Sequence, residues 1–486
     1  MMIHKHFKIL LKDVFTYGFM GTLGRVVGFL LLPIFTRIFS VEEYGVIDII
    51  AIFTNLVIVG SSLRLSASLS RYFSDDEKVP KLEELFSTLL IFSTFVNILF
   101  FTVIFIFSDS ISFLLSEKLE YSNYVKLAAG IAFFGSINKL PFMVLRRQRK
   151  IILFTTINLC SSILFTILAL VSVLWLNFGL VGIFCAQIIS NGLTLITALL
   201  VTRKLLVMTF NIDYLKIALK YSLPLIPGKF VMWANQQANR IILLYFLGLT
   251  GVGLFGVGYR ISSVIFILIT FFGRAWGPFS VEMLKYKERK FVFEQSLKYY
   301  LGLFFSAGII ISALGPELIN ILTPNEYYSA YVVIPWIIGA SIISGSTRII
   351  NIGTAISEKT IDNSFSEMIA FIVNLIISYI LIKNFGINGA AIGLFFSQIV
   401  SKLFLWRSTV RLSEIRFDIS FIIKTIIIYI ISSIFILLIA KYLSYQFSLS
   451  LIIRFIIMIF GITIIGILTK DEFLIAGIKR LVIKNE

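Results

Sequence analysis

Apolar stretches of about 20 residues follow one another along almost the whole chain, separated by short polar connections. An α-helix rises about 1.5 Å per residue, so a stretch of this length can cross a bilayer. A transmembrane β-barrel is excluded, because barrel strands alternate apolar and polar residues. The pattern predicts fourteen spans, at residues 14–35, 44–66, 84–107, 124–145, 151–176, 180–201, 222–247, 254–280, 296–315, 329–352, 365–383, 388–407, 421–440 and 451–469.

The composition predicts an all-α polytopic membrane protein. Of the 486 residues, 58% are hydrophobic and only 14% are charged, which leaves too little polar surface for a soluble domain. Cys160 and Cys185 both fall within apolar stretches. Their positions favour buried thiols over a disulfide or a metal site, and we expect neither a metal nor a cofactor.

The net charge of +17 is explained by its distribution along the chain. Basic residues concentrate in the N-terminal segment and in every second connection after it. The other connections hold only Arg37, Lys118, Lys383 and Lys441. The positive-inside rule therefore places both termini in the cytoplasm. With the charge explained in this way, we expect no nucleic-acid partner.

The chain repeats itself after about 208 residues. Four short matches occur in the same order in both halves: VEEYGVIDI (41–49) with LTGVGLFGV (249–257), AGIAFFGSINK (129–139) with IGASIISGSTR (338–348), NFGLVG (177–182) with NFGINGA (384–390), and CAQIIS (185–190) with FSQIVS (396–401). The repeated unit holds six spans, an even number, so both copies enter the membrane in the same orientation. We expect two six-helix lobes, at residues 1–205 and 206–410, around a central cavity. Residues 411–486 add two further spans and a cytoplasmic tail.

The stretch from Ser222 to Gly248 differs from a simple apolar anchor. It carries Pro224, Pro227, Lys229, Arg240 and the amides Asn235, Gln236, Gln237 and Asn239. A charge within a span costs several kcal/mol unless it faces water or a partner, and no acid lies within four residues of Lys229 or Arg240. These residues are therefore candidates for a substrate pathway. A tightly packed helix, whose amides only hold neighbouring helices, is the alternative.

Other basic residues also fall within spans or at their ends. They are Arg25, Arg64, Lys139, Arg260, Arg274 and Arg348, whereas the only acids clearly within spans are Asp48 and Glu367. This surplus suits a diphosphate, since guanidinium groups bind phosphate oxygens in a planar fork. Two alternatives remain at this point: Arg64, Lys139 and Arg348 extend to the headgroups, or Arg260 pairs with Asp48. Asp48 is also the candidate for ion coupling.

Prolines near the ends of two spans suggest where the helices bend. Pro224 and Pro227 lie in the seventh span, and Pro33 lies in the first span, its counterpart in the repeat. Proline interrupts the hydrogen bonds of a helix and permits a bend. We expect these three prolines to act as hinges between inward-open and outward-open states.

Several motifs resemble those of the polysaccharide (O-antigen type) flippases of the multidrug/oligosaccharidyl-lipid/polysaccharide exporter (MOP) superfamily. They are LLPIFTRIFSVEEYG (31–45), SRYFS (70–74), YSLPLIPGKFVMWANQQANRIIL (221–243), GVGLFGVGYRIS (251–262) and the paired NFG motifs. Together they extend over the twelve-span core.

The resemblance implies a transporter without catalytic residues in the bacterial inner membrane. Similar proteins move an undecaprenyl-pyrophosphate-linked oligosaccharide from the cytoplasmic to the outer leaflet by alternating access, through a cationic cavity between two lobes. This step serves the synthesis of surface polysaccharides such as the O-antigen of lipopolysaccharide. The implied partners are this lipid-linked substrate, a polysaccharide polymerase and a chain-length regulator. We expect coupling to H⁺ or Na⁺ because the sequence contains no nucleotide-binding motif.

Three other functions remain alternatives. A lipid II flippase is second, because its relatives share the duplicated, cationic chain. A multidrug/cation antiporter is disfavoured because the first span, 14–35, lacks an acid. A membrane-embedded polymerase or glycosyltransferase needs catalytic groups on a large outer loop, and the longest outer connections, around 108–123 and 316–328, are short.

Overall fold

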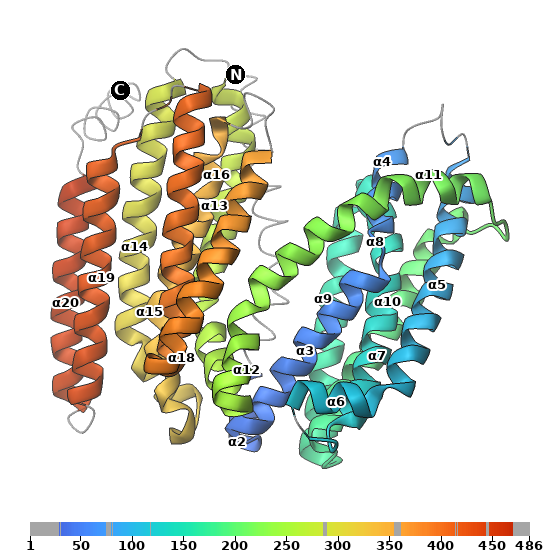
Figure 1. Ribbon diagram of the computed structural model, residues 1–486, viewed down its shortest axis with the longest axis horizontal. Coiled ribbons are helices and arrows are strands. Elements are labelled where there is room, and N and C mark those ends of the chain that lie inside the picture. The colour runs from blue at the N-terminus through green and yellow to red at the C-terminus, as the bar shows by residue number, and fades with distance from the viewer. Residues whose placement is uncertain are drawn as a thin grey trace, which may run out of the picture. The chain divides into compact units, whose positions relative to one another are not determined.

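The computed structural model describes residue 29 and residues 31–469, apart from 74–78, 80, 117, 285–288, 354–360, 414, 416 and 444–446. Every regular element in this part of the chain is helical (Figure 1). Within the described residues, twelve helices are long and apolar enough to cross a membrane. The protein is therefore a multi-pass membrane protein, as its composition predicts. Most of the first predicted span, 14–35, lies outside the described residues.

Two of these helices each contain a sharp break at a glycine. Gly248, at φ 63° and ψ −162°, interrupts α12 (Ile226–Ser262) between the predicted seventh and eighth spans. Gly386, at φ 55° and ψ −136°, interrupts α18 (Ile361–Ser413) between the predicted eleventh and twelfth spans. Only glycine adopts such conformations readily. The polar gaps in the hydropathy pattern therefore coincide with real breaks, and the total of fourteen spans stays a prediction.

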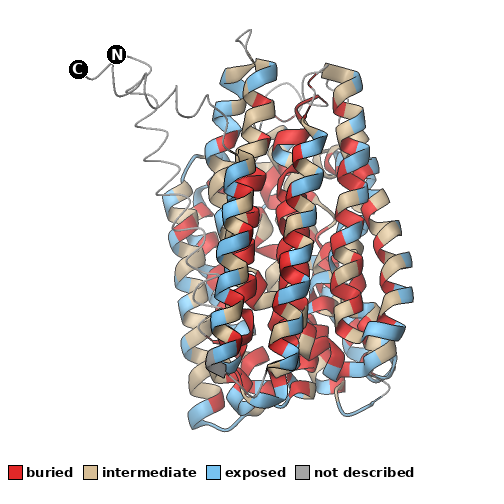
Figure 2. Cartoon of the chain, turned by 90° about the vertical axis from the view of Figure 1, so that its left-hand side faces the viewer, coloured by how far each residue is buried: buried red, intermediate tan, exposed pale blue. Residues whose placement is uncertain are grey.

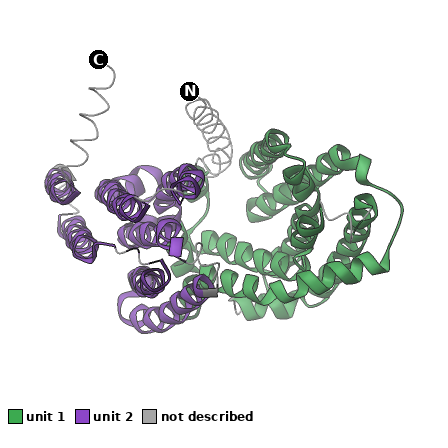
Figure 3. Ribbon diagram, turned by 90° about the horizontal axis from the view of Figure 1, so that it is seen from above, with its two compact units in different colours: residues 1–256 green, residues 257–486 purple. Residues whose placement is uncertain are grey.

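The chain divides into two compact units, residues 1–256 and 257–486 (Figure 3). The first contains α2 (Leu32–Ile38), α3 (Val41–Ser61), α4 (Leu65–Tyr72), α5 (Leu82–Ile106), α6 (Ser108–Ser116), α7 (Ser122–Ile137), α8 (Lys139–Arg147), α9 (Ile151–Leu170), α10 (Gly179–Thr202), α11 (Ile212–Ser222) and most of α12. Helix α7 packs against α3, α5 and α10, and α9 packs against α10. The proposed lobe boundaries at 205 and 410 stay predictions.

The second unit follows from the end of α12. It contains α13 (Val264–Met283), α14 (Arg289–Leu322), the 3₁₀ segment η4 (Asn325–Val333), α15 (Ile334–Gly345), α16 (Thr347–Ile350), α18, α19 (Ile419–Tyr442) and α20 (Phe447–Thr469). Helix α14 packs against α15, α19 and α20. Figure 2 shows exposed residues on the outward side of the helices that face the viewer.

The outward sides of the helices are as apolar as their buried sides. On α19, Ile423, Ile427 and Ile431 are exposed at a spacing of one helical turn, while Tyr429 and Ile436 are fully buried. A soluble helix would place polar residues on its exposed face. Apolar residues on both faces are expected where one face meets lipid.

All three predicted hinge prolines lie where a helix begins. Pro33 occupies the first turn of α2, Pro224 lies in a 3₁₀ turn (Leu223–Leu225), and Pro227 is the second residue of α12. Proline is tolerated there because the first N–H groups of a helix have no partner within the helix. The 3₁₀ turn separates α11 from α12, which meet at an angle (Figure 1). The hinge function itself stays a prediction.

A close helix crossing supports the sequence duplication. A Cβ at Gly45 would lie 2.0 Å from the carbonyl oxygen of Leu249, and a Cβ at Gly253 would lie 2.2 Å from that of Val41. Val41 matches Leu249 and Gly45 matches Gly253 at the same offset of 208, so the two contacts are reciprocal. We call residues 41–48 against 249–256 the α3–α12 crossing. The matched motifs therefore make equivalent backbone contacts at this crossing.

Each unit contains a serine pair, and the two pairs lie at equivalent places in the repeat. Ser190 of α10 donates to the backbone oxygen of Ser161 on α9 at 2.8 Å, and the two hydroxyls are 3.0 Å apart. In the second unit, Ser401 donates to the backbone oxygen of Ser366 at 2.8 Å within α18, with the hydroxyls 2.7 Å apart. Ser190 and Ser401 end the matched CAQIIS and FSQIVS motifs. The duplicated sequence therefore forms duplicated local contacts.

Candidate functional site

Three basic residues of the first unit converge beside breaks between helices. Arg64 lies between α3 and α4, where φ is +43° at Leu63 and +56° at Arg64. Lys139 is the first residue of α8, and Lys229 lies in the first turn of α12. Lys139 lies within electrostatic range of both Lys229 and Arg64. We call Arg64, Lys139 and Lys229 the basic cluster.

The basic cluster holds like charges in partly buried positions. All three side chains belong to half-buried residues, and the Nζ of Lys139 donates to the backbone oxygen of Ile58 over 3.4 Å. The Nε of Arg64 is buried without a hydrogen-bond partner, and no carboxylate within the described ranges pairs with the cluster. Consecutive non-glycine residues in left-handed conformations are uncommon and concentrate at functional sites. Such a cluster can bind an anion.

Arg240 is paired with a carboxylate from another helix. Its Nε lies 3.6 Å from Oδ2 of Asp48, and the two side chains are 14% and 10% exposed. Arg240 also donates to Oε1 of Gln237 at 3.2 Å, and its guanidinium lies 5.8 Å from the ring centre of Phe255. The sequence suggested that no acid neutralises Arg240. The structure corrects this view, because α3 supplies the acid from a distant part of the chain.

The predicted amides are divided between two sides of α12. Asn239 is 5% exposed and Asn235 is half-buried, whereas Gln236 is exposed. Residues four positions apart share a helix face, so Asn235 lies beside Asn239 and Gln236 beside Arg240. Asn239 therefore faces into the unit, and Gln236 faces outward.

The remaining described candidates lie in the second unit. The guanidinium of Arg348 lies against Gly273, where a Cβ would come within 1.2 Å of its Nη1. The indole of Trp276 donates to the backbone oxygen of Arg348 at 2.8 Å and so supports the turn at α16. Arg260 and Arg274 are half-buried on α12 and α13. Arg25 lies outside the described residues.

Lys139 and Arg348 occupy equivalent places in the two copies, as the repeat predicts. Helix α7 ends at Ile137 and α8 begins at Lys139, while α15 ends at Gly345 and α16 begins one residue before Arg348. The predicted fourth and tenth spans are thus both interrupted beside the basic residue. Each unit presents one basic side chain at its interrupted helix.

The comparisons with known proteins identify the family. The family described as "Polysaccharide biosynthesis protein" matches residues 34–330, which is more than half of the chain. The chain belongs to this family. The Lsg locus protein 1 of Haemophilus influenzae is a similar relative, 24% identical over 338 residues that cover 68% of this chain and 77% of the relative.

Solved structures show that this polysaccharide biosynthesis protein has the fold of MOP-superfamily transporters. The lipid II flippase MurJ in an inward closed conformation has a TM-score of 0.71 at 15% identity, covering 93% of this chain and 98% of that chain. An inward-facing multidrug resistance MATE transporter of the MOP superfamily has a TM-score of 0.62 at 14% identity, covering 81% and 95%. The family resemblance in the sequence motifs is confirmed.

The sequence analysis missed a deeply buried ion pair in the described part of this family member. Arg454 of α20 is 2% exposed and forms two hydrogen bonds with the carboxylate of Glu317 on α14. Glu317 was expected in an outer connection at 316–328, but α14 continues to Leu322 with Pro316 inside it. The proline suggested a helix end. The position of Arg454 within an apolar stretch of the sequence indicated that its charge needs a buried partner.

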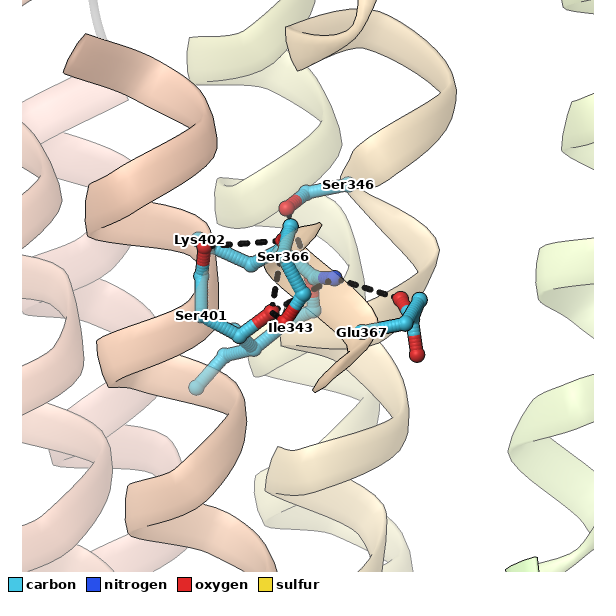
Figure 4. Close-up of polar contacts among 6 residues, drawn as sticks. All are labelled: Ile343, Ser346, Ser366, Glu367, Ser401 and Lys402. Carbon is cyan, nitrogen blue, oxygen red and sulfur yellow. Dashed lines mark hydrogen bonds and ion pairs between the residues drawn. The ribbon is translucent and has the colours of Figure 1, made fainter. Parts of the chain in front are cut away.

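A second missed pair lies beside the serine contact of α18 (Figure 4). The Nζ of Lys402 lies 3.0 Å from Oε1 of Glu367 and donates to the hydroxyl of Ser401 at 3.2 Å. Lys402, which is 5% exposed, lies within the predicted span 388–407 and was not among the predicted site residues. The charge of Glu367 is therefore neutralised by Lys402 of the same helix, α18. Glu367 does not neutralise the basic cluster.

Proposed function

We propose that this protein is a flippase that moves an undecaprenyl-pyrophosphate-linked oligosaccharide repeat unit from the cytoplasmic to the outer leaflet by alternating access. The single observation that carries the proposal is the basic cluster. Lys139 lies within electrostatic range of Lys229 and Arg64, all three residues are half-buried, and in the described ranges no carboxylate pairs with them. The family membership and the flippase-like fold support the same function.

The chemistry of the cluster fits a diphosphate headgroup. A guanidinium group binds two phosphate oxygens at once, and an ammonium group adds a mobile point charge. Low-dielectric surroundings strengthen the attraction to a dianion. Arg64 would orient the diphosphate, while Lys139 and Lys229 would neutralise it.

The other candidates take secondary roles in the proposal. Arg25, Arg260, Arg274 and Arg348 would bind phosphate oxygens at other stages of the cycle. The amides Asn235, Gln236 and Asn239 have the donors and acceptors needed for sugar hydroxyls. Asp48 is the proposed coupling residue for H⁺ or Na⁺.

The charge distribution supports an orientation with both termini in the cytoplasm of a bacterial inner membrane. In that orientation a polysaccharide polymerase and a chain-length regulator would receive the product at the outer leaflet. The substrate would then contribute to O-antigen, lipopolysaccharide or another surface polysaccharide.

Deletion of the protein with lipid analysis tests the function. We expect lipid-linked single repeat units to accumulate on the cytoplasmic leaflet. Lys139→Gln and Lys229→Gln, introduced together, should reproduce that accumulation, and the two Lys→Arg changes should largely prevent it. The control is Lys216→Gln, because Lys216 is exposed on α11 and pairs with Asp213. Normal transport by the double Gln variant would contradict the proposal.

A lipid II flippase is the second candidate, and the MurJ likeness over 93% of the chain favours it. The same deletion distinguishes the two. Accumulation of the peptidoglycan precursor, with surface polysaccharide unchanged, would favour lipid II over an oligosaccharide repeat unit.

A further inference from the structure

The Asp48–Arg240 pair differs from Arg454–Glu317, another buried arginine–carboxylate pair within the described residues. Arg454 and Glu317 are joined by two hydrogen bonds, and Arg454 also donates to the backbone oxygen of Ala313 at 2.8 Å. Arg240 and Asp48 are joined by a contact of 3.6 Å, which is longer than a charge-assisted hydrogen bond of about 2.7–2.9 Å. The Arg454–Glu317 pair is therefore joined by hydrogen bonds, whereas the contact between Arg240 and Asp48 is longer than a hydrogen bond.

The Asp48 carboxylate lies at a special position in the repeat. Asp48 matches Gly256 at the offset of 208 that relates Gly45 to Gly253. A Cβ at Gly256 would lie 2.0 Å from Oδ2 of Asp48. The Asp48 carboxylate therefore contacts Gly256, which is the residue that matches Asp48 in the second copy, at the α3–α12 crossing. Only a glycine at 256 leaves room for it.

The crossing itself depends on close backbone approach. Gly45 and Gly253 admit the facing carbonyl oxygens, and the positions 41, 45 and 48 lie on one helical face, as do 249, 253 and 256. Small residues permit such approach between membrane helices. The carboxylate of Asp48 thus belongs to the contact surface of the crossing and also to the surroundings of Arg240.

We propose that Asp48 is the resident counter-anion of Arg240, that a phosphate group of the substrate replaces it, and that the replacement loosens the α3–α12 crossing. This inference rests on the proposed function, since it assigns Arg240 to the same phosphate-bearing ligand. The diphosphate as a whole carries two negative charges, whereas a carboxylate carries one, and its oxygens fit the guanidinium fork. Once replaced, the carboxylate leaves Gly256, and the crossing loses one of its contacts.

The test measures binding of inorganic pyrophosphate to the full chain in phosphatidylcholine nanodiscs. Asp48→Asn removes the competing charge at nearly constant volume. We expect its pyrophosphate affinity to rise roughly tenfold, a typical size for coupling between competing interactions. Arg240→Gln should lower the affinity, and Asp48→Asn should have no effect in the Arg240→Gln background. The proposed exchange is overturned if Asp48→Asn does not raise the pyrophosphate affinity. It is also overturned if the tenfold rise persists in the Arg240→Gln background.

Glycine variants test the same idea without changing any charge. Gly256→Ala pushes the carboxylate away from its position and should also raise pyrophosphate affinity. Gly228→Ala is the matched control on the same helix, because a Cβ there meets no other group within 4 Å. Equal affinities for these two variants would overturn the proposed position of the carboxylate.

Hydrogen exchange measures the crossing directly. Pyrophosphate should accelerate amide exchange at residues 41–48 and 249–256 and leave residues 308–317 of α14 unchanged. Unchanged exchange at the crossing overturns the coupling. If wild-type protein binds no pyrophosphate, the proposed function fails together with this inference. If binding depends on Lys139 and Lys229 but not on Asp48, only the inference fails.

Discussion

At the scale of single residues, the charged side chains within the predicted membrane spans are the most informative feature of the sequence. The sequence predicts that basic residues within spans matter, and three of them converge in the basic cluster. It could not predict the partners of Arg240 and Arg454, because Asp48 and Glu317 are distant along the chain. A hydropathy pattern shows which charged residues lie within apolar stretches, but the tertiary fold determines which residues pair with them.

The Arg454–Glu317 pair predicts a stability effect. Glu317→Gln leaves the buried guanidinium without its counter-charge, which costs about 3–5 kcal/mol when one partner of a buried pair is lost. The midpoint of thermal unfolding in detergent, followed by tryptophan fluorescence, should fall. Replacing both residues by apolar ones, as Glu317→Leu with Arg454→Met, should restore most of the loss. If Glu317→Gln unfolds like the wild type, the pair contributes little to stability.

At the scale of helices, hydropathy predicts positions well and short interruptions poorly. The predicted sixth span, 180–201, agrees closely with α10, and the polar gaps near Gly248 and Gly386 coincide with helix breaks. The breaks at Asn138 and Ser346 were not predicted. A window of about 20 residues averages over a turn of this kind, because the chain on both sides stays apolar.

The reciprocal glycines predict equal effects in the two copies. Gly45→Ala and Gly253→Ala each place a methyl group onto a backbone oxygen, at Leu249 and Val41 respectively. Backbone cannot move aside as a flexible side chain can, so each change should destabilise the protein by about 1–3 kcal/mol. Thermal unfolding in detergent measures both, with Gly228→Ala as the control. A large effect at one glycine and none at the other would contradict the pseudo-symmetric contact.

At the scale of the whole molecule, the repeat is the feature that the sequence predicts most directly. The matched motifs contain the reciprocal glycines, one serine of each serine pair (Ser190 and Ser401) and the equivalent Lys139 and Arg348. Two copies of one unit, each with a basic side chain at an interrupted helix, suit a carrier that presents one site to either side of a membrane in turn. The Asp48–Arg240 pair breaks the likeness of the two copies, because Asp48 matches Gly256 in the second copy.

The prolines between α11 and α12 predict a change in transport rate. With Pro224→Ala and Pro227→Ala together, the backbone can continue as one helix through residues 223–227, because the missing N–H donors are restored. A stiffer joint should slow flipping roughly fivefold, equivalent to about 1 kcal/mol of activation free energy, while pyrophosphate binding stays unchanged. Pro335→Ala is the matched control, since Pro335 also lies in a first turn after a 3₁₀ segment. Full transport activity in proteoliposomes would exclude this joint as a hinge.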